Sequence, residues 1–435
     1  MRKVSFVMAW LFVAALCTPC VFGEEVRSLS MAEMFRLADE NNRTVQVYSA
    51  ALREAEAAVK TAQNAYLPSL HVAASASYTD SGTILDRDLS HPMSADVPHF
   101  GNNFMLEASQ VIFAGGAVRN GVKISKLKSR LGELQYQSSR QQAHFLVAGN
   151  YIELFKLQNQ LRIFESHISQ TKKVLESMRH RHRAGTALHN DITRYELQLQ
   201  NLTFSRIQLQ NSKQIVNDRL TSALGLPAGA VIAPQEIAAQ DERRELAYWK
   251  ETSAQAPALA AARTTVQMSE YGEKIARSEH WPRLELFAGS YLNGPIVTEI
   301  PPIDKNFNSL AAGVRLQYDL ANFYKTGRDV KEKRMAVEKA RAERAAAEEE
   351  IRLAVEAAYI RYTEAFLLLD TKEKSVELAR KNYDTVSYRY DNGLALITDL
   401  LDASSQKLDA ELQKVNARAN IAYNYYQLQY AAGTI

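Results

Sequence analysis

Apolar residues recur along long stretches of the chain with alternating steps of four and three residues. In the second half this stripe runs through Val355, Tyr359, Tyr362, Phe366 and Leu369, which is the seam pattern of a coiled coil. A matching stripe follows at Leu408, Leu412, Val415, Ala419, Ala422 and Tyr426. The pattern predicts long helices that pair as antiparallel hairpins.

The two longest predicted helices cover about residues 117–183 and 325–391, which contain no proline and few interior glycines. At about 1.5 Å per residue each would be about 100 Å long, far longer than the usual helix of a globular domain. Gly185 and Gly393 follow these stretches, and glycine suits a helix end where the backbone needs a positive φ. We therefore expect the tips of the two hairpins near these glycines.

Four shorter segments alternate apolar and polar residues with a period of two. Leu310, Val314 and Leu316 occupy one face of such a segment, and Arg315 lies on the other, as in a strand with one apolar face. Each run has the length that a tilted strand needs to cross a bilayer. The four predicted strands lie at about residues 69–79, 103–113, 283–292 and 309–319.

The chain contains an internal duplication. The string from His182 to Ile192 realigns on Tyr390 to Leu400 at a shift of 208 residues. The prolines that precede the first strand of each half, Pro68 and Pro282, are 214 residues apart. We therefore expect the second half to lack six residues in the polar loop between its two strands.

This duplication predicts two structural repeats with the same order of elements. The first covers about residues 24–225 and the second about residues 246–435, with a linker at 226–245. Each repeat is expected to run helix, strand, loop, strand, long helix, tight turn and helix. Self-similarity of this length indicates a repeated supersecondary unit.

The N-terminus resembles a secretory signal peptide. Arg2 and Lys3 precede an apolar run from Val4 to Leu16, and small residues end at Gly23, so cleavage is expected after residue 23. Cys17 and Cys20 both fall in this segment, so the mature chain would have no thiol. Acylation of a cysteine is an alternative, although the residues before each suit it poorly.

The charges of the mature chain nearly cancel. Removing Arg2 and Lys3 from 52 basic residues leaves 50 against 49 acidic ones. This balance, with no basic stripe or recognised module, argues against nucleic-acid binding. After residue 23 no apolar stretch reaches the length of a membrane helix.

Four strands cannot close a barrel by themselves. In lipid every unpaired peptide group costs several kcal/mol, so membrane sheets close into barrels. Two copies would give eight strands and three would give twelve, and only the larger barrel leaves room for a lumen. The geometry favours a trimer if the protein conducts.

Two motifs stand out beside the duplication. One is Ser109-Gln-Val-Ile-Phe-Ala-Gly-Gly116 after a strand, and the other is Tyr390-Asp-Asn-Gly-Leu-Ala-Leu-Ile-Thr-Asp-Leu-Leu-Asp-Ala403. With the duplicated pattern, they make the chain resemble the TolC-like outer-membrane efflux proteins over essentially all of its mature length. The resemblance implies a mainly α fold with a small β part. In it, long α-hairpins form a periplasmic α-barrel, and four strands per chain join a shared 12-stranded transmembrane barrel in a homotrimer.

The same resemblance implies a passive outer-membrane duct of a tripartite efflux or type I secretion system. Its partners would be a periplasmic membrane-fusion adaptor, an inner-membrane transporter of RND, ABC or MFS type, and outer-membrane lipid. No cofactor is expected. The alternative is an exported structural coiled coil, such as a periplasmic spacer or a surface fibre, which does not account for the paired strands.

By resemblance the periplasmic entrance is closed at the hairpin tips. The aperture aspartates of the family match Asp399 and Asp402, with Asp191 as the first-repeat counterpart. Rings of carboxylates would favour cations. The alternative for these residues is capping of a helix N-terminus, and the two roles are compatible.

A tyrosine that latches the closed tip in the family matches Tyr390, but the family's arginine two residues after Gly393 is Ala395 here. The basic cluster at 179–183 is a candidate substitute that could pair with Asp391 of a neighbouring hairpin. Its alternative is a solvated helix surface. The tips themselves, at Gly185, Thr186, Gly393 and Leu394, are the predicted docking site for the adaptor.

Three histidines, His180, His182 and His189, lie near one tip, but residues 180 and 182 point to different helix faces. We therefore predict no metal site there. An enzyme is also not expected, because the sequence lacks the Gly-x-Ser-x-Gly, Walker, His-Glu-x-x-His and dinucleotide-binding motifs.

Overall fold

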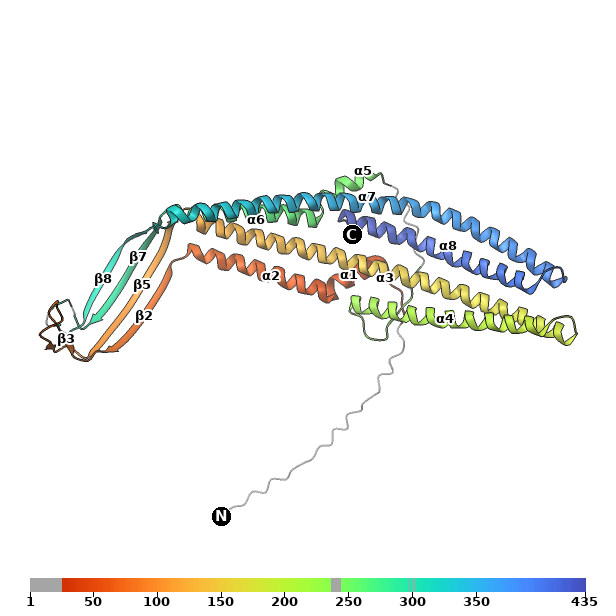
Figure 1. Cartoon of the computed structure of the whole chain (residues 1–435), viewed down its shortest axis with the longest axis horizontal. Helices are drawn as coiled ribbons and strands as arrows, with labels where there is room; N and C mark the ends of the chain where they lie inside the picture. Colours follow the sequence, from red (N-terminus) through yellow and green to blue (C-terminus); the bar gives the residue numbers. More distant parts are fainter. Residues whose placement is uncertain (1–25, 236–243, 297, 300–301) are drawn as a thin grey trace, which may run out of the picture.

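The computed structural model describes residues 26–235, 244–296, 298–299 and 302–435. The molecule is elongated, with a sheet at one end and long helices along the rest (Figure 1). The predicted signal peptide at 1–23 and its two cysteines lie outside the described residues. Within the described ranges no helix is both long and apolar enough to cross a membrane.

The mainly α fold with a small β part is confirmed, and its elements follow in a similar order in the two halves of the chain. The first comprises β1 (Val26–Arg27), α1 (Met31–Asn41), α2 (Arg43–Gln63), a 3-10 turn (Asn64–Tyr66), β2 (Ser69–Tyr78), β3 (Gly82–Ile84), β4 (Met93–Ala95), β5 (Phe100–Ala114), α3 (Ala117–Arg183) and α4 (His189–Leu224). The second comprises β6 (Val231–Ile232), α5 (Leu246–Ser253), α6 (Pro257–Ser278), β7 (Arg283–Gly294), β8 (Phe307–Gln317), α7 (Asn322–Asp391) and α8 (Ile397–Ala432).

The main sheet is antiparallel, with strand order β2-β5-β7-β8. The strands of the two repeats meet at the β5–β7 pair, where Leu106 lies opposite Ser290. The register of β5 shifts between Val111 and Phe113. Among the described strands, β2 and β8 each pair on one side only, so both long edges of the sheet are open.

The bounds of the strands differ from the sequence prediction by one to three residues, most at β5 and β8. β5 begins at Phe100 rather than near residue 103, and β8 covers 307–317 rather than 309–319. The end of β8 is set by Asp319, whose carboxylate accepts a hydrogen bond from the Ala321 backbone N–H at 2.9 Å. This Asx-type turn replaces ladder pairing and leads into α7.

The sheet has one apolar and one polar face. Leu310 and Val314 are 83% and 60% exposed in the single chain, and the register places Leu286 beside Val314. The opposite face carries Glu107 and Arg315, which contact each other across the strands. Such alternation is the arrangement of a membrane barrel strand, apolar toward lipid and polar toward the lumen.

The long helices form two antiparallel hairpins, α3 with α4 and α7 with α8 (Figure 1). Of the predicted seam of α7, Val355 and Tyr362 are fully buried, while Tyr359, Phe366 and Leu369 pack against the same core. α7 begins at residue 322, three residues before the predicted start. The coiled-coil stripes thus provide the helix-to-helix core, as expected for seam residues.

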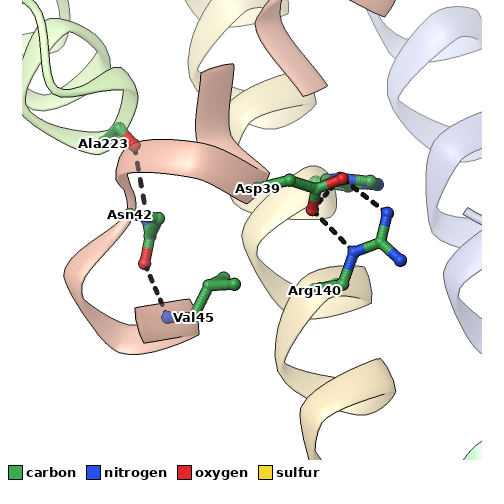
Figure 2. Close-up of polar contacts among 6 residues, drawn as sticks. Asp39, Asn42, Val45, Arg140 and Ala223 are labelled. Carbon is green, nitrogen blue, oxygen red and sulfur yellow. Dashed lines mark hydrogen bonds and ion pairs between the residues drawn. The ribbon is translucent and has the colours of Figure 1, made fainter. Parts of the chain in front are cut away.

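The sequence pattern predicts one helix before the first strand, but the structure has two, α1 and α2, divided at Asn42. The Asn42 amide oxygen accepts hydrogen bonds from the Thr44 and Val45 backbone N–H groups, at 2.9 and 3.3 Å, and so caps α2. Its amide nitrogen donates to the Ala223 carbonyl at 3.5 Å (Figure 2). Asn42 therefore ends α1, starts α2 and ties both to α4.

A polar cluster joins α1 to α3 beside this cap. Figure 2 shows Asp39 facing Arg140, whose Nε donates to the carboxylate at 2.8 Å. His144 contacts the same carboxylate at 2.9 Å and stacks on Phe35 with ring centroids 4.4 Å apart. Burial lowers the pKa of His144, although Asp39 opposes this effect. The cluster holds the N-terminal helix against the middle of the long hairpin.

The segment predicted as a linker, 226–245, contains ordered structure at its start. β6 pairs in parallel with β1, and the Asn217 side chain of α4 accepts from the Ile232 N–H at 2.9 Å and donates to the Ala230 carbonyl at 2.8 Å. A two-residue strand has no periodic signal, so the sequence pattern could not reveal it. Residues 236–243 lie outside the described part.

Candidate functional site

The two hairpin tips are built on the same turn. Gly185 and Gly393 have φ values of +74° and +73°. At the first tip the Gly185 and Thr186 N–H groups donate to carbonyls of the last helical turn, at 2.9 Å each. Gly393 and Leu394 do the same at 3.0 and 2.7 Å. Both are Schellman turns, in which a residue with a side chain at the glycine position would be strained.

An apolar core joins the tips of the two hairpins of one chain. Each long helix contributes a buried side chain to it: Met178 of α3, Tyr195 of α4, Tyr383 of α7 and Leu400 of α8. The other buried members are Leu175, Ile192, Tyr390, Ile397 and Ala403. Because all four long helices contribute, the position of one tip depends on the other.

Two polar layers lie behind this core and connect the same helices. The His167 side chain of α3, 4% exposed, contacts the Glu411 carboxylate of α8 at 3.0 Å. Arg380 of α7 bonds the other Glu411 oxygen at 2.8 Å. In the next layer Gln170 of α3 donates to the Tyr383 hydroxyl at 2.9 Å. Each layer thus ties the first hairpin to the second.

The Glu411 layer makes tip stability dependent on pH. The hydrogen bond from His167, reinforced by Arg380, lowers the pKa of Glu411 from 4.5 to about 2. A depressed carboxyl pKa stabilises the folded state above the unfolded value and loses that stabilisation as pH falls through the folded value. We expect a contribution of about 1–2 kcal/mol at neutral pH, discounted for solvent screening, that declines between pH 4.5 and about 2.

Thermal unfolding of the detergent-solubilised protein between pH 7 and pH 3 measures this contribution. E411Q should unfold at lower temperature at pH 7, and its disadvantage should shrink toward pH 3. E373Q is the matched control, because Glu373 forms an exposed pair with Lys414 at 2.9 Å. If the difference in unfolding temperature between the wild type and E411Q stays constant with pH, the Glu411 carboxyl does not make stability depend on pH.

The predicted aperture aspartates lie on the first turns of α8. The Asp399 carboxylate accepts a hydrogen bond from the Leu396 N–H at 3.0 Å, so it caps the helix. Asp402 accepts from the Gln406 amide at 2.7 Å, and both aspartates are exposed. Asp191 lies at the matching place in the first turn of α4 and is half-buried. The Asp399 carboxylate therefore caps the helix and still remains exposed to solvent.

Tyr390 lies in the tip core with only 7% exposure. The Arg181 guanidinium of the first hairpin lies 5.2 Å from the centre of its ring and 3.9 Å from the Asp391 carboxylate. Burial raises the pKa of Tyr390, and the Arg181 charge opposes this rise. Arg181 therefore contacts Tyr390 at a tip whose own residue 395 is alanine.

The rest of the basic cluster does not reach the second hairpin through any contact in the described residues. Arg179 pairs with Glu196 of α4 at 2.7 Å, and Arg183 donates to His180 at 2.9 Å. The His182 Nδ1–H donates a hydrogen bond to the Ala187 carbonyl oxygen at 2.9 Å. The described residues contain no group of three or more potential metal ligands.

Three exposed leucines surround the tip turns. Leu394 is 67% exposed, and Leu188 and Leu396, which precede α4 and α8, are each 70% exposed. Thr186 is also exposed, and its hydroxyl donates to the Arg181 carbonyl at 3.0 Å. Leu188 and Leu396 were not among the residues predicted from sequence. They could have been found because each lies three residues after a tip glycine.

Comparison with known proteins places these features in a family. A family model described as outer membrane efflux protein matches residues 35–226 and 249–434. The outer membrane protein TolC of Vibrio cholerae is 23% identical over 410 residues, covering 93% of this chain and 91% of that protein.

Solved structures have the same fold. The outer membrane protein VceC of Vibrio cholerae superposes with a TM-score of 0.80 at 16% identity, covering 93% of this chain and 96% of VceC. The CmeC outer membrane channel of Campylobacter jejuni has a TM-score of 0.79 at 14% identity, covering 100% of this chain and 94% of CmeC. Since the family model matches both repeats, this chain belongs to the outer membrane efflux protein family.

Proposed function

We propose that three copies of this outer-membrane efflux channel subunit form one passive duct, gated at the helical tips and docked there to a periplasmic adaptor. The observation that carries the proposal is the open-edged sheet with an apolar outer face, continuous with two long hairpins. The duct catalyses no reaction, and energy comes from an inner-membrane transporter of RND, ABC or MFS type.

The open edges of the sheet support oligomerisation. β2 and β8 lie on opposite sides of the sheet, so β8 of one chain can pair with β2 of the next (Figure 1). Three chains would give twelve strands and a lumen, whereas two would give a barrel filled by side chains.

Exposed apolar stripes on the helices support the same arrangement. Leu197 and Phe204 of α4 are 63% and 61% exposed, and Ile360 and Leu367 of α7 are 62% and 70% exposed. Each pair is spaced by seven residues, as in a coiled-coil seam. α4 and α7 lie on opposite long sides of the molecule (Figure 1). In a ring of copies, the neighbour on one side can therefore cover the α4 stripe and the neighbour on the other side the α7 stripe.

An exported structural coiled coil, the alternative function, leaves the apolar face of the sheet in water. Membrane fractionation tests the channel function directly. The protein should be recovered with the outer membrane and migrate unheated near three times its monomer mass. A soluble periplasmic monomer would contradict it.

The exposed leucines support the tips as the docking site for the adaptor. A charge at Leu394 would have to be desolvated on binding, and this cost weakens an apolar contact. We expect L394D cells to retain a fluorescent efflux substrate as strongly as cells that lack the gene. L394M, which keeps the apolar volume, should export normally. Unchanged export by L394D cells with normal channel levels would remove this tip from the docking surface.

The exposed carboxylates of Asp399 and Asp402 support a cation-selective aperture. In the trimer they would form two rings at the entrance, where carboxylates favour cations. We expect D399N/D402N to lower the cation-to-anion permeability ratio by about tenfold, because a unit charge roughly 6 Å away in water changes the cation and anion populations by about threefold each, in opposite directions. Asparagine retains the acceptor that caps α8 while removing the charge.

Reversal potentials in planar bilayers measure this ratio. The matched control is D409N, because Asp409 accepts from Gln413 just as Asp402 accepts from Gln406, one heptad earlier. The control should conduct like the wild type. An equal effect of D409N and D399N/D402N would show that the tip carboxylates do not form the aperture.

A further inference from the structure

A cluster of charged and aromatic side chains lies on the polar face of the sheet. Glu107 of β5 accepts a hydrogen bond from the Tyr291 hydroxyl of β7 at 2.6 Å. Arg315 of β8 lies 3.4 Å from Glu107 and 3.8 Å from Glu285 of β7. Its guanidinium also lies 4.7 Å from the centre of the Phe287 ring. Side chains of β5 and β7 therefore hold Arg315 of β8 in one orientation.

Two glycines make room for this cluster. A Cβ at Gly313 would come within 3.2 Å of the Phe287 ring. A Cβ at Gly289 would come within 2.9 Å of the Tyr291 hydroxyl and 3.0 Å of the Leu106 carbonyl. The glycines thus leave space for both aromatic side chains, of which Phe287 contacts Arg315 and Tyr291 bonds the carboxylate of Glu107.

The cluster faces the lumen of the proposed barrel. Residues 106, 286 and 314 lie on the apolar face, and the residues next to them along each strand point to the other side. Glu107, Glu285, Phe287 and Arg315 therefore share the luminal face. The charged residues that the four strands place on this face are Arg283, Arg315, Glu107 and Glu285, together with His71.

The two signs of charge are not equally accessible to the lumen. The Glu107 and Glu285 side chains are 17% and 16% exposed, whereas that of Arg315 is 44% exposed. The carboxylates lie low against the sheet, and the guanidinium covers them. A solute in the lumen would therefore meet Arg315 first.

We propose that Arg315, braced by Glu107 and Glu285, forms a ring of three guanidinium groups that favours passage of anions through the membrane-spanning part of the channel. The proposal rests on the trimeric duct proposed above. Rings of arginine or lysine select for anions in pores. The carboxylates hold the guanidinium against the wall, so the ring supplies charge without closing the lumen.

Reversal potentials of the purified trimer in potassium chloride gradients test this role. R315Q should raise the cation-to-anion permeability ratio by about sixfold, because a unit charge roughly 8 Å away in water changes the cation and anion populations by about 2.4-fold each, in opposite directions. E107Q/E285Q should lower it, while glutamine at 107 still accepts from Tyr291. R315K keeps the charge but not the planar contact with Phe287, and should resemble the wild type.

The salt concentration and the tip variant complete the design. The effects should decrease from about 0.1 M to about 1 M salt, because the screening length falls from about 10 to about 3 Å. All variants are also made in the D399N/D402N background, so that the charges of the tip do not hide the effect of the barrel residues on the permeability ratio. Unchanged ratios in R315Q and E107Q/E285Q, or shifts of the same sign in both, would overturn the role of Arg315. A wild-type protein that forms no channels would instead overturn the duct itself.

Discussion

An arginine introduced at Ala312 is expected to prevent assembly of the channel in the outer membrane. Ala312 lies on the apolar face of β8, opposite Ala288 of β7, and is exposed in the single chain. An arginine facing lipid near the bilayer midplane costs about 2–4 kcal/mol, and a trimer would contain three. We expect A312R to lose the heat-modifiable trimer band and to be degraded or to accumulate outside the outer-membrane fraction.

The neighbouring residue provides the matched control. Ala311 is also exposed, but it lies one step along the strand and therefore points to the polar face. A311R introduces the same side chain into the lumen, where water can solvate it, and should assemble at near wild-type levels. Equal assembly of A312R and A311R would contradict the assignment of the two faces.

Truncation of Leu400 is expected to open the tips. Leu400 is 1% exposed and lies in the core that joins the two hairpins. Replacing a fully buried leucine with alanine costs about 2–5 kcal/mol. Because this core connects all four helix ends, the loss should separate the second hairpin from the first. We expect L400A to raise the single-channel conductance and to make the tip loops sensitive to protease.

L396A is the control for this variant. Leu396 lies four residues earlier in the chain and is 70% exposed, so its truncation removes no core contact. It should leave conductance and protease sensitivity of the isolated channel unchanged. If L400A conducts like L396A while its melting temperature falls, the tip core stabilises the fold but does not close the entrance.

The helical framework could be predicted because its signals are local. The apolar stripe of α7 repeats every seven residues, and α3 contains no proline, so both signals are visible within a few helical turns. The tip glycines mark the helix ends, since both adopt the positive φ that such a turn requires. The break at Asn42 and the end of β8 at Asp319 were missed, because both depend on a single side chain that bonds to nearby backbone.

The chemistry of the tips could be predicted only in part. Asp399, Asp402 and the two glycines could be found because they lie in sequence motifs near the helix ends. From sequence the basic cluster at 179–183 was expected only as a possible partner of Asp391. In the structure Arg181 is the member of that cluster that lies near Asp391, and its contact with the Tyr390 ring was not predicted. The bond between His167 and Glu411 joins residues 244 positions apart, and neither residue stands in a motif.

The sequence by itself determined the helices, the four strands, their duplication and the turn at each tip, because periodicity and turn chemistry act between near neighbours. The tertiary structure decided which partners meet between the hairpins and across the sheet. Arg181, His167 and Arg315 acquire their roles only when helix packing and strand register place residues from the two repeats side by side. Contacts between residues so far apart in the chain depend on the packing of the whole chain. No single stretch of sequence determines them.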